Sequence, residues 1–245
     1  AHQRSGPPRR LSALPMPWPD ALLFLACAFA AEVLGTMAGF GAATVLTPVA
    51  ALFMDMKTAI ALVACFHLFG NASRLVFFGR HIDWRVWAMF GLTAIACSGL
   101  GAWLTAALSS AALTFAFGLF LLAYVAVSVR FGERLRFPMT RSALVVGGMA
   151  SGLIAGLLGT GGAIRSACLL ALGLPTAAYL GTSASIALVV DATRLPIYLR
   201  AGLLPSTLWP LLAALVAVAF AGAWTGQRLV RRLSASVFRR LVLVL

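Results

Sequence analysis

Charge is scarce in this chain. Only 10% of its 245 residues are charged, compared with about 25% in a typical soluble domain. The chain has six acidic residues and one lysine, Lys57. The net charge of +13 therefore comes almost entirely from arginine. No stretch is both polar enough and long enough to form a soluble domain.

Residues that catalysis and metal binding require are also few. The four cysteines lie in apolar segments without a CxxC pair, which disfavours disulfides and a zinc site and predicts buried thiols. No HExxH, GxSxG or P-loop motif occurs, and of the three histidines one lies deep in an apolar run. We therefore expect neither an enzyme nor an ATP-driven pump, and no cofactor or metal.

Long apolar runs are what the sequence does contain. Hydrophobic residues make up 62% of the chain, and several runs approach the ~20 residues that a helix needs to cross a bilayer. Arginines flank these runs, as in the cytoplasmic loops of membrane proteins, which argues against nucleic-acid binding. The sequence predicts an all-α, multi-pass protein of the inner (plasma) membrane, surrounded by lipid. The clearest runs are residues 21–37, 58–78, 86–108, 113–129 and 203–224.

The chain repeats itself at an offset of about 120 residues. The matches keep their order along the chain, which favours two homologous repeats over chance. They pair GFGAATVLTP (39–48) with GTGGAIRSAC (159–168), NASRLVFFGR (71–80) with DATRLPIYLR (191–200), and GAW (101–103) with GAW (222–224).

These matches predict the domain organisation. A flexible N-terminal tail, residues 1–19, precedes a first transmembrane repeat, residues 20–130. A cytoplasmic linker, residues 131–141, leads to a second transmembrane repeat, residues 142–245.

Loop charge indicates the orientation of the repeats. The arginine-rich linker and residues 227–240 are both expected in the cytoplasm. The counterpart of the latter segment, residues 105–112, is uncharged, which predicts inverted repeats, as in many secondary transporters. The segments after the two glycine clusters, residues 42–53 and 163–172, are too short to cross alone. Each either completes a broken helix or re-enters the membrane.

Several motifs together resemble the TauE/SafE family. They are the first glycine cluster followed by VLTP, the helix ending FFGRHIDW, the GAW element and GLIAGLLGTGGA in the second half, over about residues 30–235. The resemblance implies a permease or exporter of sulfite, organosulfonates or related sulfur anions. A transporter of another small anion, such as a carboxylate, and a non-transporting membrane scaffold or assembly protein are the alternatives. The coupling ion (H⁺ or Na⁺), the transport direction and homodimer formation stay open.

The glycine clusters are the first candidates for substrate binding. Glycine allows an unwound backbone, and a helix that restarts there presents free N–H groups and the positive end of its dipole to an anion. Arg165 adds a guanidinium that can bind a sulfonate in bidentate fashion. Close helix packing is the alternative, and we expect it for the pairs Gly35–Gly39 and Gly152–Gly156. The candidates are Gly39, Gly41, Gly159, Gly161, Gly162 and Arg165.

A second candidate set lies on two equivalent helices. Asn71 and Arg74, like Asp191 and Arg194, are spaced to share a helix face, and ionisable residues at membrane depth are functional candidates. Alternatively, Arg74 extends to the interface and Asp191 only neutralises Arg194. Candidates for a coupling proton are Asp191, Glu32 and His67, with a packing or pairing role as the alternative. Weaker hydroxyl candidates are Thr44, Thr47, Thr182, Ser183 and Ser185.

Overall fold

The computed structural model describes residues 16–131, 140–234 and 237–238, in which all regular elements are helical. Short 3-10 turns (Gly79–His81 and Ser206–Leu208) and a π-helical turn (Trp87–Gly91) extend the ends of three helices. The α-helices are α1 Trp18–Ala38, α2 Ala43–Ala50, α3 Met56–Phe78, α4 Trp84–Val86, α5 Leu92–Ala107, α6 Ser110–Phe131, α7 Arg141–Leu158, α8 Gly162–Ala171, α9 Thr176–Arg200 and α10 Trp209–Val230.

Six stretches of the described chain are long and apolar enough to cross a membrane, which confirms the prediction of an all-α, multi-pass membrane protein. Residues 1–15 of the predicted tail lie outside the described residues, and α1 begins at Trp18, two residues before the predicted start of the first repeat. The last span starts and ends later than the run 203–224. Most of the linker, residues 132–139, lies outside the described residues. The six spans are Trp18–Ala38, Met56–His81, Trp84–Ala107, Ser110–Val127, Arg141–Leu158 and Ser206–Val230.

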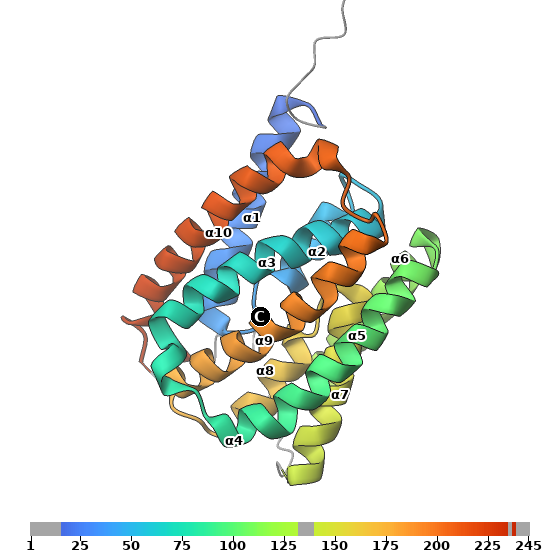
Figure 1. Ribbon diagram of the computed structural model, residues 1–245. Coiled ribbons are helices and arrows are strands. Elements are labelled where there is room, and N and C mark those ends of the chain that lie inside the picture. The colour runs from blue at the N-terminus through green and yellow to red at the C-terminus, as the bar shows by residue number, and fades with distance from the viewer. Residues whose placement is uncertain (1–15, 132–139, 235–236, 239–245) are drawn as a thin grey trace, which may run out of the picture.

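The helices α3 and α9 lie side by side in the middle of the molecule and run in opposite directions (Figure 1). The backbone N–H of Asp83, just beyond α3, donates to the hydroxyl of Thr182 near the start of α9 at 2.9 Å. Tyr198 near the end of α9 packs in one apolar cluster with Ala61 near the start of α3. α9 has 25 residues and is therefore long enough to cross a bilayer. Its polar residues lower its hydropathy, so it is not among the six apolar spans.

Four further helices flank this central pair, and they form two closely packed pairs in which both helices run in the same direction. α10 packs against α1, and α7 packs against α5. In the second contact Gly152 and Gly156 face the backbone carbonyls of Ala94 and Ser98, where no Cβ would fit. This confirms the packing prediction for that glycine pair. Gly35 packs against the backbone of residues 41 and 42 at the start of α2, and Gly39 packs against Tyr179 of α9, so the prediction of close packing is confirmed for this pair as well.

Each long helix before a glycine cluster forms a hairpin with the short helix after it. Phe53, just after α2, makes an edge contact with Phe24 near the start of α1, with ring centroids 5.7 Å apart. Likewise Cys168, late in α8, lies against Gly147 near the start of α7. Both short helices therefore return toward the end at which the preceding long helix begins, as a re-entrant segment does.

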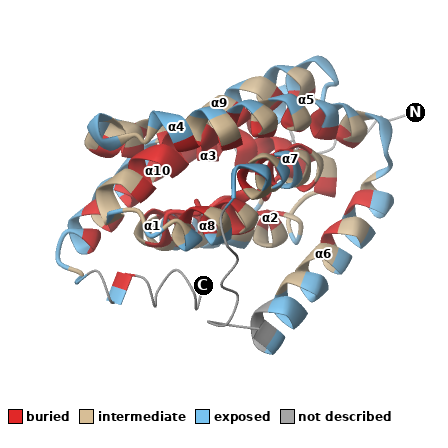
Figure 2. Cartoon of the chain, turned by 90° about the horizontal axis from the view of Figure 1, so that it is seen from below, coloured by how far each residue is buried: buried red, intermediate tan, exposed pale blue. Residues whose placement is uncertain are grey.

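The two halves pack alike. In the sequence repeat, α1, α2, α3 and α5 correspond to α7, α8, α9 and α10. When each helix is exchanged for its equivalent, the contact between α1 and α10 becomes that between α7 and α5, and the contact between α3 and α10 becomes that between α9 and α5. The contacts α3–α9 and α2–α8 join equivalent elements. The cores of these contacts are buried (Figure 2).

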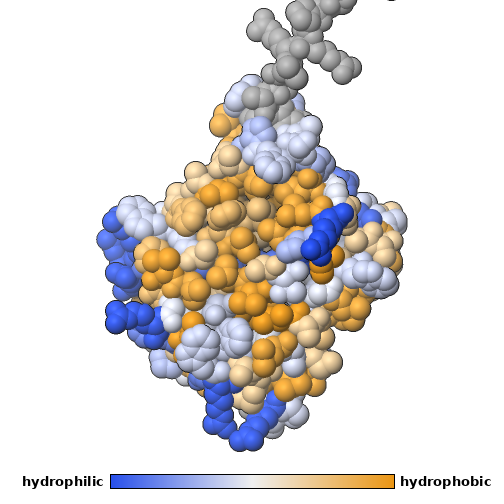
Figure 3. Space-filling view, in the orientation of Figure 1, coloured by the Kyte–Doolittle hydropathy of each residue, from blue (hydrophilic) through white to orange (hydrophobic). Residues whose placement is uncertain are grey.

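Apolar side chains also cover much of the outer surface. Figure 3 shows them across the middle of one face, with hydrophilic groups toward its margins. α6 is the most exposed span: Leu113 and Phe117 are buried against the core, whereas Phe115 and Leu122 are more than two-thirds exposed. This surface suits lipid contact.

The start of α3 offers a test of local stability. The Asp55 carboxylate caps this helix, accepting hydrogen bonds from the backbone N–H groups of Lys57 and Thr58 and from the hydroxyl of Ser110. Partial burial acts to raise the pKa of Asp55, but these hydrogen bonds outweigh it and lower the pKa. The stabilisation is therefore present at neutral pH and is lost as the pH falls through the lowered pKa.

We expect Asp55→Ala to cost about 1 kcal/mol of unfolding free energy at pH 7. Denaturant unfolding in detergent at several pH values measures it. Asp55→Asn keeps a capping side chain but cannot titrate, so its stability should lose the acid dependence that is due to Asp55. An equal acid dependence in Asp55→Asn would contradict this assignment.

Candidate functional site

The glycine clusters do interrupt the helices. Gly39, Gly41 and Gly159 have φ values of 76°, 88° and 80°, a conformation that side chains disfavour, so unwinding at these three positions is confirmed. Gly161 has a φ of −99° and Gly162 is the first residue of α8. Gly161 nevertheless lies in the non-helical break before α8, so the expectation of an unwound backbone is wrong for Gly162 alone, whose small size instead permits close contact.

The two breaks touch each other. Gly162 lies against the carbonyl of Phe40, leaving no room for a Cβ. The hydroxyls of Thr44 on α2 and Thr160 in the second break are 2.8 Å apart. The first N–H groups of α2 and α8 have no partner within their own helices, so two positive dipole ends lie in this region.

Arg165 is 3% exposed and is held at the end of α1. Its Nη2 donates to the carbonyl of Phe40 at 3.2 Å, and its Nε donates to the Ser183 hydroxyl at 3.0 Å. Ser183 in turn donates to the carbonyl of Gly39, and the Tyr179 hydroxyl donates to that of Ala38. The guanidinium therefore offsets the negative end of the α1 dipole, and two of its donors are engaged by the protein.

Asp191 is the centre of a buried network between α3 and α9. Its Oδ1 accepts from Nε and Nη2 of Arg194 at 3.0 and 2.7 Å. Its Oδ2 lies 2.9 Å from Asn71 Nδ2 and 2.8 Å from His67 Nδ1. Asn71 and Asp191 occupy equivalent positions of the sequence repeat, so the pair lies where the two halves meet.

The other two charged groups of this region form a second pair. Arg74 Nη2 lies 3.4 Å from Glu32 Oε1, which also accepts a hydrogen bond from Thr36 at 3.1 Å. Arg74 is 1% exposed, so the alternative in which it extends to the interface is wrong. Asp191 pairs with Arg194, as the alternative for that residue expects, but its contacts with Asn71 and His67 go beyond neutralising Arg194. Arg194 additionally donates to the carbonyl of Ala155 at the end of α7.

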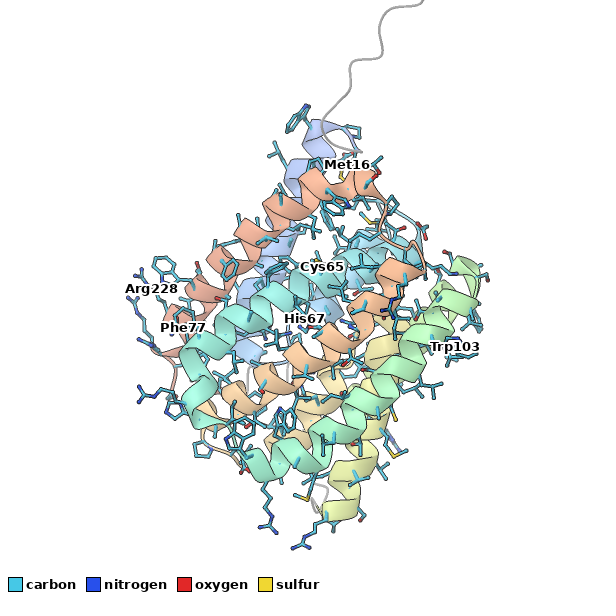
Figure 4. All side chains as sticks on the ribbon, viewed as in Figure 1. Met16, Cys65, His67, Phe77, Trp103 and Arg228 are labelled. Carbon is cyan, nitrogen blue, oxygen red and sulfur yellow. The ribbon has the colours of Figure 1, made fainter. Side chains whose placement is uncertain are left out.

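Five buried polar atoms in and near these pairs have no hydrogen-bond partner among the described residues: His67 Nε2, Asn71 Oδ1, Glu32 Oε2, Thr47 Oγ1 and Arg74 Nη2, which has only its ion-pair contact with Glu32. Such atoms are costly unless water or a ligand satisfies them. The buried residues of this region include three arginines but two carboxylates. This composition leaves a formal positive charge when both carboxylates are ionised, and it suits an anion. Figure 4 shows His67 in the middle of the molecule.

Sequence reasoning missed three hydroxyls. Tyr179 and Tyr198 hold the ends of α1 and α7, and Thr160 joins the two breaks. A signal was present, because two of the three tyrosines of the chain lie on the polar α9 and Thr160 stands between two cluster glycines. Within the described segments no three His, Cys, Asp or Glu side chains converge to hold a metal ion.

Comparison with known proteins gives one match. The family model described as sulfite exporter TauE/SafE matches residues 23–245. Neither the curated proteins nor the solved structures gave a match.

Proposed function

Since this chain belongs to the sulfite exporter TauE/SafE family, we propose that it is a secondary transporter of sulfite or an organosulfonate. The family consists of membrane transporters of sulfur anions rather than enzymes, and the six apolar spans make the chain a multi-pass protein of the cell membrane. The family match supports a sulfur anion. The structural observation that supports an anionic substrate is the meeting of two helix breaks beside three buried arginines that outnumber the carboxylates.

The anion binds where the two breaks meet. Free N–H groups at the starts of α2 and α8 can donate to its oxygens, and Arg165 lies in the first turn of α8 with donors left beyond the two engaged by Phe40 and Ser183. The residues proposed to form the site are Gly39, Gly41, Asn71, Arg74, Gly159, Gly161, Gly162, Arg165, Asp191 and Arg194.

Transport proceeds by alternating access between two inverted repeats, residues 20–130 and 142–245. Two observations support this proposal: equivalent helices α3 and α9 run antiparallel, and the helix contacts are preserved when the halves are exchanged. Motion of one half against the other then exposes a fixed central site to either side.

The end of the molecule at which α3 and α10 finish faces the cytoplasm. These helix ends share an apolar cluster containing Phe78 and Val230. Basic residues gather in the sequence around them, as cytoplasmic loops require. They are Arg80, Arg85, Arg228, Arg231 and Arg232.

The first experiment is a thermal-unfolding screen of the purified protein in detergent. We expect sulfite or methanesulfonate at 100 times its Kd to stabilise the folded state by about 2.7 kcal/mol, whereas chloride has no effect. In Arg165→Met the ligand-induced shift should disappear. The matched control is Arg228→Met, because Arg228 stacks on Trp224 far from His67 (Figure 4) and should leave the shift intact.

Each outcome bears on the proposal. A shift with acetate and none with the sulfur anions would indicate a carboxylate transporter. No shift with any anion would contradict anion transport, and equal loss of the shift in both arginine variants would contradict the proposed location.

A further inference from the structure

We propose that His67 takes up a proton when the substrate anion binds, so that one H⁺ accompanies each anion. This inference rests on the proposed function and deepens it by assigning both the coupling ion and the residue that carries it. It follows from the hydrogen bonds of the imidazole ring, the position of its free nitrogen and the charges around it.

The hydrogen bonds fix which nitrogen of the neutral ring carries the proton. Asp191 accepts two hydrogen bonds from Arg194 and is therefore the ionised partner of a guanidinium. A carboxylate only accepts, so His67 Nδ1, 2.8 Å from Asp191 Oδ2, must donate. Asn71 Nδ2 also lies 3.1 Å from Nδ1, but it donates to Asp191 Oδ2 at 2.9 Å, because an accepting Nδ1 would face the carboxylate lone pair to lone pair. Nε2 of the neutral ring is then a bare acceptor.

This acceptor lies at the first helix break. Nε2 is buried without a hydrogen-bond partner, and it lies so close to Gly41 that a Cβ there would overlap with it. Gly41 has a positive φ and is two residues before the first residue of α2. The lone pair of Nε2 therefore lies beside the N–H groups at which we place the anion.

Proton and anion consequently favour each other at this position. With a neutral ring, the lone pair of Nε2 repels a nearby oxyanion. With a protonated ring, Nε2–H becomes a charged donor that the oxyanion can accept. Because linkage is reciprocal, an anion that prefers the imidazolium must also tighten proton binding.

The neighbouring charges act in both directions. Asp191 on α9 stabilises an imidazolium through Nδ1, whereas Arg194 on α9 and Arg74 on α3 oppose it. Glu32 on α1 is paired with Arg74, and Arg165 on α8 is held by the end of α1. α2 has no titratable side chain. The charged residue of α10, Arg228, lies near the C-terminal end of that helix. A bound anion adds the negative charge that favours protonation.

At His67 Nε2 the chemistry of the free atom favours H⁺ over Na⁺ as the coupling ion, and the buried oxygens of this region without a hydrogen bond belong to other residues, Glu32, Asn71 and Thr47. The atom is an imidazole nitrogen, which binds a proton readily. Hard cations prefer oxygen ligands, and both oxygens of Asp191 are already engaged by Arg194, Asn71 and His67.

Proton uptake on ligand binding tests the inference directly. Purified protein in weakly buffered detergent solution at pH 8 is mixed with methanesulfonate or sulfite. A pH-indicator dye then reports protons, and the thermal shift reports binding. Methanesulfonate does not titrate in this range, so uptake belongs to the protein. We expect up to one proton per bound anion, and a Kd that rises about tenfold per pH unit above the titration of the free protein.

The variant His67→Asn keeps a donor able to reach Asp191 but cannot titrate. We expect it to bind more weakly, with no uptake and a Kd for methanesulfonate that does not vary with pH. If sulfite alone binds, uptake is taken as the difference between wild type and His67→Asn, which removes the titration of sulfite itself. The exposed His81 provides the matched control, because His81→Asn should take up protons like the wild type.

The outcomes separate the two proposals. Binding of neither anion would overturn the proposed function together with this inference. Binding to the wild type without proton uptake would overturn the inference alone. Undiminished uptake in His67→Asn would overturn the assignment to His67, and the wild-type measurement decides the coupling even if that variant does not fold.

Discussion

Asp191→Ala is expected to lower the free energy of unfolding by about 3–5 kcal/mol, because it leaves Arg194 buried without its counter-charge. The carboxylate accepts hydrogen bonds from Arg194, Asn71 and His67, and all of these side chains are buried. The loss would therefore loosen the contact between α3 and α9. Denaturant unfolding of the purified protein in mild detergent measures the change.

A second substitution on the same helix provides the control. Asp191→Ala combined with Arg194→Met removes both charges of the pair, and replacing a buried ion pair by apolar side chains is often nearly neutral. We expect the double variant to recover much of the stability but not anion binding. A double variant less stable than Asp191→Ala would contradict the view that the unpaired guanidinium is the cause.

Gly156→Leu is expected to cost about 3 kcal/mol or more, or to prevent folding. A Cβ at Gly156 would overlap with the carbonyl of Ser98 on α5. Backbone atoms of a helix cannot rotate away as side chains do, so α5 and α7 would have to separate. Unfolding in detergent and the yield of monodisperse protein are the measurements.

Gly118 on α6 is the matched position, since a Cβ there meets nothing within 4 Å. Gly118→Leu should leave stability unchanged or raise it by up to about 1 kcal/mol, because leucine favours a helix more than glycine does. A similar loss at both positions would show that a leucine at any helical glycine is harmful, and the proposed close packing would then not explain the effect.

Local features of the fold were predictable from sequence. Hydropathy located the apolar spans, and the glycine clusters marked helix breaks at Gly39 and Gly159. The role of a glycine could not be predicted where contacts with other segments determine it. Gly161 and Gly162 resemble the other cluster glycines in sequence, but what determines their role is the carbonyl of Ser151 or Phe40 that approaches each.

The candidate site was predictable in its residues more than in its geometry. Asn71 and Asp191 stood out as equivalent positions, but their direct contact requires that α3 and α9 pair antiparallel. The position of Arg165 at the end of α1 depends on a carbonyl 125 residues away. Spacing along one helix reports which residues share a face, and it carries no information on what another segment brings to that face.

The polarity of α9 has a consequence for how the chain enters the membrane during synthesis. A charged residue at the centre of an isolated helix adds roughly 2.5–3.5 kcal/mol to its insertion free energy, and α9 carries both Asp191 and Arg194 there. The ion pair reduces this penalty, and His67 and Asn71 on α3 reduce it further. We therefore expect the first half to be in place when α9 is synthesised, so that α3 acts as its template within the bilayer.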